Sequence, residues 1–301
     1  MKHNIKITTI LLIIFVLAQF IGIGIIYGYI DQEKSAQEGE TVFIDLPIGE
    51  RPPMEEKTSF IPLVIAIILG TIVLLLLIKY NLQWIWKIWF LFAIVLSLTI
   101  AWGAFIEMRI ALFLALFFGI WKIFKNNVWV QNFTELFVYG GLAAIFSPVF
   151  SLWSVIALLF LISIYDYYAV NKSKHMVTLA KSQTKAKIFA GLMIPYKVSK
   201  TAIKKTKEKV KSIKAKVKTI PTKTRTAILG GGDIGFPLIF AGVILKEMGL
   251  WQALIIPIFS TMGLAFLFWY GKEDKFYPAM PFISAGCLLG LGIVYLLGFI
   301  V

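Results

Sequence analysis

Two stretches decide how this chain folds: LISIYDYYAV at residues 161–170 and ILGGGDIGFP at residues 228–237. Each is apolar enough to lie inside a lipid bilayer, and each contains one aspartate, Asp166 in the first and Asp233 in the second. An ionised carboxylate near the centre of a bilayer costs at least ~2.5 kcal/mol, so such residues are rare and usually functional. Two of them on neighbouring apolar segments predict a pair that works together.

The composition around these stretches is that of a multi-pass membrane protein. The chain has 301 residues, of which 59% are hydrophobic. Several apolar runs exceed the ~18 residues that mark a membrane helix. We therefore predict an all-α polytopic membrane protein with nine transmembrane helices. The predicted spans are 7–29, 60–78, 85–106, 110–124, 128–146, 151–170, 226–245, 251–270 and 281–301.

The distribution of basic residues predicts the orientation. With the N-terminus in the cytoplasm, the inside segments and span ends carry 25 Lys and Arg residues and the outside segments carry five. The loop 31–59, which holds eight acidic residues, then lies outside. This asymmetry follows the positive-inside rule. We expect a cytoplasmic N-terminus, an external C-terminus and a location in the cell membrane.

The predicted spans divide the chain into three parts. Residues 1–170 form a six-helix part with Asp166, residues 171–225 form a basic cytoplasmic loop, and residues 226–301 form a three-helix part with Asp233. The loop holds seventeen Lys and Arg residues and one acid, so it accounts for the net charge of +14. Such a segment beside membrane helices favours anionic lipid headgroups as partners. We expect no nucleic-acid partner, because no recognisable binding module occurs.

Part of the basic loop has helical periodicity. Apolar residues recur among the lysines at spacings of seven, three, four and three, namely Ile203, Val210, Ile213, Val217 and Ile220. This pattern predicts an amphipathic helix lying on the cytoplasmic leaflet. A solvated charged linker is the alternative interpretation.

The two aspartates are expected at similar depth in the membrane. Asp166 lies about four residues, or ~6 Å, from the cytoplasmic end of its span, and Asp233 lies about seven residues, or ~10 Å, from its own. Adjacent antiparallel helices would place them face to face. Such a pair shares one proton, so that one carboxylate activates a water and the other protonates the carbonyl under attack. Because the pair titrates jointly, neither residue is assigned as acid or base.

The residue content excludes two other chemistries within the spans. Both histidines, His3 and His175, lie outside the predicted spans, and Cys287 is the single cysteine. The spans therefore contain neither a His-Glu-x-x-His zinc site nor a Ser–His dyad. Hydrolysis by two aspartates needs no metal and no cofactor, and we expect none.

Glycines and prolines loosen the backbone near the second aspartate and before the last span. Three glycines at 230–232 precede Asp233, and Pro237 removes one helical hydrogen bond after it. The run at 278–281 breaks the helix near the start of the ninth span. Irregular backbone at membrane depth is tolerated beside a cavity or other protein. Its free groups are suited to pairing with an extended substrate strand.

Together the motifs resemble those of the presenilin/signal peptide peptidase family of intramembrane aspartyl proteases. They are Tyr165-Asp166 on one span, Gly230-x-Gly232-Asp233 on the next, and Pro278-Ala279-Met280 before the last. The stretch KHMVTLA at 174–180 resembles the archaeal presenilin homologues in particular. The resemblance covers all nine spans in the expected order, and the ordered trio is far more specific than any one motif.

The resemblance implies a protease that cuts the transmembrane helices of other membrane proteins, with Asp166 and Asp233 as the catalytic pair. Tyr165, Gly230 and Gly232 would support the active site, and substrate would be bound by Pro278, Ala279, Met280 and Pro281. Met280 stands where the family has leucine, a swap that conserves volume, so little loss is expected. The orientation is similar to that of presenilin, which implies substrates with an external N-terminus. A homo-oligomer is a further candidate partner.

Two other functions compete with this one. A transporter or ion channel would use the aspartates as a cation or proton site, and broken helices also occur in transporters. The internal repeats common in such proteins are not found here. A prepilin-type peptidase also uses Gly-x-Gly-Asp, but the Tyr-Asp and Pro-Ala-Met motifs and the larger span count argue against it.

Other polar residues in the spans are first assigned structural roles. Lys87 and Lys122 each lie within a turn of a cytoplasmic end and are expected to reach the interface rather than to pair inside the bundle. Glu135 is predicted to be a near-surface acid, with a place on a water path as the less favoured alternative. Tyr165 either forms a hydrogen bond at the site or packs against its neighbours.

Overall fold

The computed structural model describes residues 5–46, 49, 55–80, 82–125, 127–172, 189–197, 224–271 and 277–298, most of which are helical. Two of the elements are short, the helix α2 (Gln32–Glu38) and the 3₁₀ turn η1 (Ser147–Val149). The long helices are α1 (Ile5–Gly28), α3 (Phe60–Lys79), α4 (Gln83–Gly103), α5 (Met108–Lys125), α6 (Val128–Phe146), α7 (Leu152–Asn171), α10 (Gly231–Met248), α11 (Leu250–Tyr270) and α12 (Met280–Gly298).

Each long helix coincides with one of the nine predicted spans. Six of them, α1, α3, α4, α7, α11 and α12, are long and apolar enough to cross a membrane by length and composition. The other three, α5, α6 and α10, carry more polar residues, among them Lys122, Glu135 and Asp233. All three contribute polar side chains to the region described below.

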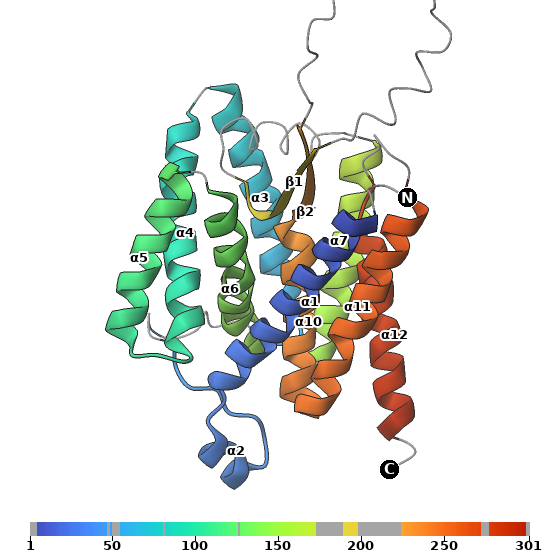
Figure 1. Cartoon of the computed structure of the whole chain (residues 1–301). Helices are drawn as coiled ribbons and strands as arrows, with labels where there is room; N and C mark the ends of the chain where they lie inside the picture. The colour runs from blue at the N-terminus through green and yellow to red at the C-terminus, as the bar shows by residue number, and fades with distance from the viewer. Residues whose placement is uncertain are drawn as a thin grey trace, which may run out of the picture.

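The helices form one bundle in which α10 is central. The start of α1 and the end of α12 lie at opposite ends of the bundle (Figure 1). Helix α10 contacts α1, α6, α7, α11 and α12. Its side chains from Pro237 to Leu245 are all buried. By contrast, Leu74 is the one buried residue recorded for α3, so the helix that carries Asp233 lies in the core and α3 lies at the edge.

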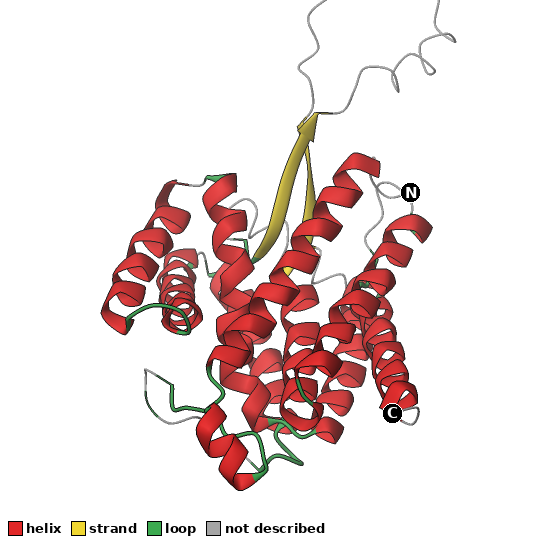
Figure 2. Ribbon diagram, turned by 60° about the horizontal axis from the view of Figure 1, so that its bottom comes forward, coloured by secondary structure: helices red, strands yellow, loops and turns green. Residues whose placement is uncertain are grey.

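One element contradicts the all-α prediction. Strands β1 (Gly191–Lys197) and β2 (Thr224–Gly230) form an antiparallel pair with Gly191 opposite Gly230. This pair projects from the end of the bundle opposite α2 (Figures 1 and 2). The predicted span 226–245 is therefore wrong at its start, because the helix begins at Gly231.

The burial pattern explains why residues 224–230 form a strand. Ala227 and Leu229 are buried, whereas Thr226 is exposed and Ile228 is half-buried, which is the two-residue alternation of a strand. Three successive glycines then disfavour extension of the helix toward the N-terminus. The predicted amphipathic helix over 203–220 lies outside the described residues.

Two side chains at the start of α6 hold the outer edge of β1. Asn132 donates from Nδ2 to the Met193 carbonyl at 2.8 Å and accepts the Met193 N–H at 2.9 Å. Gln131 Nε2 donates to the carbonyls of Phe189 and Gly191 at 2.8 and 3.0 Å. These amides satisfy backbone groups that a neighbouring strand would otherwise satisfy. The position of β1 is therefore fixed by α6.

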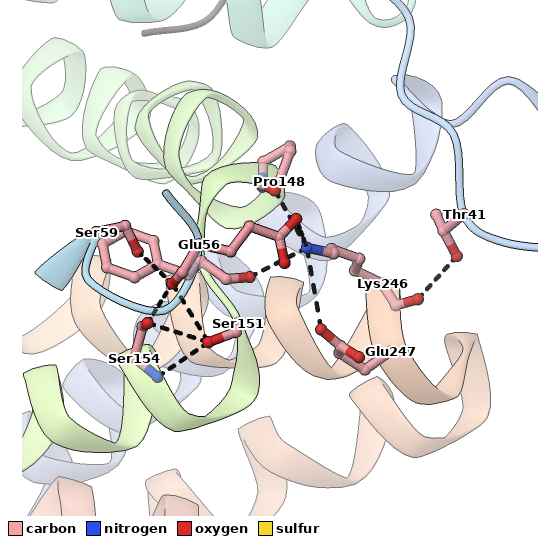
Figure 3. Close-up of polar contacts among 9 residues, drawn as sticks. Thr41, Glu56, Ser59, Pro148, Ser151, Ser154, Lys246 and Glu247 are labelled. Carbon is pink, nitrogen blue, oxygen red and sulfur yellow. Dashed lines mark hydrogen bonds and ion pairs between the residues drawn. The ribbon is translucent and has the colours of Figure 1, made fainter. Parts of the chain in front are cut away.

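A second polar cluster fastens the opposite end of α10 (Figure 3). Lys246 Nζ lies 2.8 Å from Glu56 Oε1 and donates to the carbonyls of Pro148 and Phe150 at 3.2 Å. The Glu56 carbonyl in turn accepts hydrogen bonds from the hydroxyls of Ser59, Ser151 and Ser154. The segment before α3 is thereby tied to the ends of α10 and η1 and to the start of α7.

Candidate active site

Asp166 lies near the end of α7 and is almost fully buried, with 4% of its surface exposed. Its Oδ2 accepts a hydrogen bond from the backbone N–H of Met280 at 3.1 Å. The Ser163 hydroxyl, about one turn earlier on α7, donates to the Ser284 hydroxyl on α12 at 2.9 Å. Helices α7 and α12 are thus joined beside the first aspartate.

The predicted break before the last span lies directly against Asp166. Tyr277, Pro278 and Ala279 are not helical, and α12 begins at Met280. The first N–H groups of a helix have no partner within it. The Met280 N–H is therefore available to the carboxylate, and Pro278, Ala279 and Met280 are all buried around it. Met280 thus meets Asp166 through its backbone.

Asp233 lies in the first turn of α10, immediately after β2. Gly230 is extended, with φ −66° and ψ 150°, and the Gly231 N–H donates to the Ala190 carbonyl at 3.1 Å. The chain therefore passes from the sheet to Asp233 within three residues. Pro237 lacks the N–H that would bond to the Asp233 carbonyl, so the first turn of α10 is one hydrogen bond short. The Asp233 side chain is half-buried.

The two aspartates come from helices that touch, because α7 and α10 are in contact. One carboxylate approaches from the end of α7 and the other from the start of α10, on segments that carry no other acidic side chain nearby in sequence. Within the described ranges, no three His, Cys, Asp or Glu side chains gather as a metal site. The arrangement offers carboxyl groups for acid–base chemistry in a largely apolar setting.

Comparison with known proteins identifies the family. Residues 41–301 match the profile described as "Signal-peptide peptidase, presenilin aspartyl protease". The chain belongs to this family. It is therefore an intramembrane aspartyl protease and a multi-pass membrane protein. The family model covers both aspartates and the Pro-Ala-Met motif.

Two solved structures share the fold. A presenilin family intramembrane aspartate protease in space group C222 is 16% identical, with a TM-score of 0.59 over 94% of each chain. The structure of such a protease in space group P2 is 17% identical, with a TM-score of 0.58 over 95% of this chain and 96% of that one. Comparison with the curated proteins gives no match.

Gly231 stands at the variable position of the family's Gly-x-Gly-Asp motif and leaves the least room for a side chain among the three glycines. A Cβ on Gly231 would lie 2.4 Å from the Tyr139 hydroxyl oxygen, a distance at which either the tyrosine side chain or the backbone at Gly231 must move. A Cβ on Gly230 or Gly232 would lie 3.3 Å from its nearest neighbour, the Asp233 carboxylate or the Phe236 ring. The sequence motif directed attention to Gly230 and Gly232, whereas the tightest backbone approach occurs between them.

Gly231→Ala is expected to lower the cleavage rate by about tenfold or more. The Tyr139 hydroxyl is bonded to Glu135 and resists displacement, so the first turn of α10 must move and carry Asp233 with it. A misplacement of about 1 Å can cost up to about a hundredfold in rate. The measurement is the cleavage rate of a transmembrane substrate at matched amounts of folded enzyme.

Gly235→Ala is the matched control for this substitution. Its Cβ would face the same tyrosine ring at 3.6 Å, which is ordinary contact, and the rate should stay within about twofold. Equal rates for the two alanine variants would contradict the argument.

Tyr165 contacts the edge helix of the bundle. Its hydroxyl lies 3.2 Å from the Thr71 hydroxyl on α3. The side chain before Asp166 therefore links α7 to α3, the least buried of the six apolar helices.

Gln19 is a site residue that the sequence analysis missed. This fully buried side chain on α1 donates from Nε2 to the Ile234 carbonyl at 2.8 Å, in the turn that holds Asp233. The available signal was a single amide side chain within the long apolar run 7–29.

The predictions for Lys122 and Glu135 are wrong. Both side chains are 1% exposed, and Lys122 Nζ forms an ion pair with Glu135 Oε1. Glu135 also accepts hydrogen bonds from Gln131 and from the Tyr139 hydroxyl. Lys122 and Glu135 pair with each other between α5 and α6, so neither needs to reach the membrane–water interface for a partner.

Proposed function

We propose that Asp166 and Asp233 are the catalytic pair of this protease. The observation that carries the proposal is the contrast between the two buried acids of the described helices, Asp166 and Glu135. Glu135 is neutralised by Lys122, whereas the hydrogen bond to Asp166 comes from a backbone N–H. Within the described part of the chain, no Lys or Arg forms an ion pair with Asp166. A costly buried carboxylate that no Lys or Arg of the described residues neutralises fits a role in chemistry better than one in structure.

The proposed reaction is hydrolysis of a peptide bond by a bound water. One carboxylate takes a proton from the water as its oxygen attacks the carbonyl carbon, and the other gives a proton to the carbonyl oxygen. When the tetrahedral intermediate collapses, the C–N bond breaks and the leaving nitrogen takes up a proton. Two close carboxyl groups that share one proton supply both functions. The pair titrates jointly, so acid and base are not assigned to single residues.

The substrates that we propose are transmembrane segments in extended form, held by the β2 edge and the motif 278–281. Met193 bonds outward to Asn132, so its partner Ile228 in the antiparallel ladder also points its N–H and C=O outward, on the far edge of β2. The described strands form a two-stranded sheet, with none beyond that edge. An added strand there would run toward Asp233. The buried residues Pro278 to Met280, beside Asp166, would line the other side of the bound substrate segment.

For the membrane arrangement we propose nine crossings, with a cytoplasmic N-terminus and an external C-terminus in the cell membrane. The charge asymmetry of the loops supports this orientation, and so do the opposite positions of the first and last helix ends (Figure 1). By this orientation the basic residues 171–225 meet anionic lipid headgroups. Substrates would enter with an external N-terminus.

Binding of an aspartyl-protease transition-state analogue tests the catalytic proposal. Wild-type protein is expected to bind the analogue, and Asp233→Ala is expected to weaken binding by at least about a hundredfold, because analogues gain most of their affinity from the catalytic groups. Glu107→Ala, which removes an exposed acid between α4 and α5, serves as the control. Equal affinities for wild type and Asp233→Ala would rule out the pair.

A further inference from the structure

A buried ion pair joins α5 to α6. Lys122 Nζ and the Glu135 carboxylate form it, and both side chains are almost completely shielded. Removing two charges from water is repaid only when the geometry is good and the remaining hydrogen-bonding capacity is used. In a helix bundle that packs mainly through apolar contacts, such a pair calls for a further reason.

Both oxygens of Glu135 accept hydrogen bonds. Oε1 accepts from Lys122 and from Gln131 Nε2, the latter at 2.9 Å, while Oε2 accepts from the Tyr139 hydroxyl. Lys122 also lies over the Phe90 ring, 5.7 Å from its centroid. A buried hydrogen-bonded network of this kind holds its members in one arrangement.

The network reaches the start of α10 directly through Tyr139. Tyr139 leaves no room for a Cβ at Gly231, and a Cβ at Gly235 would make ordinary contact with its ring; these glycines lie two residues before and two residues after Asp233. Tyr139 is also close enough to Asp233 to interact with it electrostatically. Because Glu135 accepts a hydrogen bond from the Tyr139 hydroxyl, the tyrosine ring is held in place and limits where the first turn of α10 can lie.

A second connection runs through the sheet. Gln131, bonded to Glu135, also donates to the Phe189 and Gly191 carbonyls at each side of Ala190. The Ala190 carbonyl accepts from the Gly231 N–H, and Gly191 pairs with Gly230. The same carboxylate therefore constrains both the helix turn and the strand that leads into it.

We propose that the Lys122–Glu135 pair, acting through Tyr139 and Gln131, is a positioning centre that sets the location of Asp233 for catalysis. The four side chains are positioning residues, since they act on the turn that holds the aspartate and not on the scissile peptide. This inference rests on the proposed catalytic role of Asp233. A purely structural ion pair would stabilise the contact between α5 and α6 and leave turnover by the folded enzyme unchanged.

The double variant Lys122→Met/Glu135→Gln separates positioning from stability. Each single substitution leaves a buried charge or donor without its partner and should lower the melting temperature, whereas the neutral double variant should regain much of the loss. For the folded double variant we expect kcat to fall by at least about tenfold with KM within about twofold, because the aspartate is displaced while substrate binding is retained. Tyr139→Phe, which keeps the ring and loses only the hydroxyl, should lower kcat in the same direction.

Matched controls and Asp233→Asn complete the experiment. Lys87→Met removes a lysine of α4 that lies over the Phe124 ring, and Tyr295→Phe removes the hydroxyl of an exposed tyrosine on α12; both should keep kcat within about twofold. If Asp233→Asn is inactive but the folded double variant or Tyr139→Phe keeps the wild-type kcat, the positioning role is overturned. A rate loss that tracked only the folded fraction would overturn it as well. Cleavage by Asp233→Asn would overturn the catalytic pair itself, and with it this inference.

Discussion

Asp166→Asn and Asp233→Asn are each expected to reduce peptide cleavage by at least about a thousandfold, within the range that positioned acid–base groups contribute. The amide has nearly the shape of the carboxyl group but neither takes nor gives the proton that hydrolysis requires. At position 166 the asparagine oxygen still accepts the Met280 N–H, so the contact between α7 and α12 is retained. The measurement is single-turnover cleavage of a transmembrane substrate in liposomes.

Two comparisons make this result specific. Glu107→Gln, an isosteric change at an exposed acid, should cleave at the wild-type rate. The double variant Asp166→Asn/Asp233→Asn should be little worse than either single variant, because the two groups act as one unit and their losses do not add. A single variant that kept more than about a tenth of the wild-type rate would be incompatible with a shared-proton pair.

Met280→Pro is expected to lower the cleavage rate by about ten- to a hundredfold. Met280 is the first residue of α12, a position where proline is well tolerated in a helix. Proline nevertheless lacks the N–H that bonds to Asp166. Hydrogen bonds to charged groups contribute about 1.5–3 kcal/mol, which corresponds to this loss if the bond orients the carboxylate for reaction.

Met280→Leu is the matched control. It keeps the N–H and nearly the same volume, and it introduces the residue expected from the family resemblance, so cleavage should stay within about twofold of wild type. Thermal unfolding in detergent checks that the proline variant is folded. If Met280→Pro and Met280→Leu cleaved equally well, the backbone bond to Asp166 would have no part in the reaction.

The long helices were predictable because apolar length is a strong local signal. All nine predicted spans contain a helix, and the break at Pro278–Ala279 before Met280 follows from proline alone. The strand β2 was not predicted, because its apolar residues continue into α10 and a run of this kind fits either element. Its identity depends on pairing with β1, which lies more than twenty residues earlier in the chain.

The polar contacts of the site depend on helix rotation, which the sequence does not show. Lys122 and Glu135 stand on two consecutive helices, but only the packed bundle turns them toward each other. The same holds for Gln19, whose partner Ile234 is 215 residues away. The glycine motif can be recognised in the sequence. That Gly231 is the glycine facing Tyr139 depends on how the first turn of α10 is rotated in the bundle.

The cluster around Lys246 has a mechanical consequence for Asp233. Thirteen positions separate the two residues on α10, which is about 20 Å along a helix. Lys246 is bonded to Glu56 and to two carbonyls, so this end of α10 is fixed, and Asp233 lies at the other end of the helix. A tilt of only about 3° then shifts Asp233 by about 1 Å, enough to switch a reactive geometry on or off. Small rotations of one helix, set by what lies against Gly231, therefore suffice to control where the second carboxylate stands.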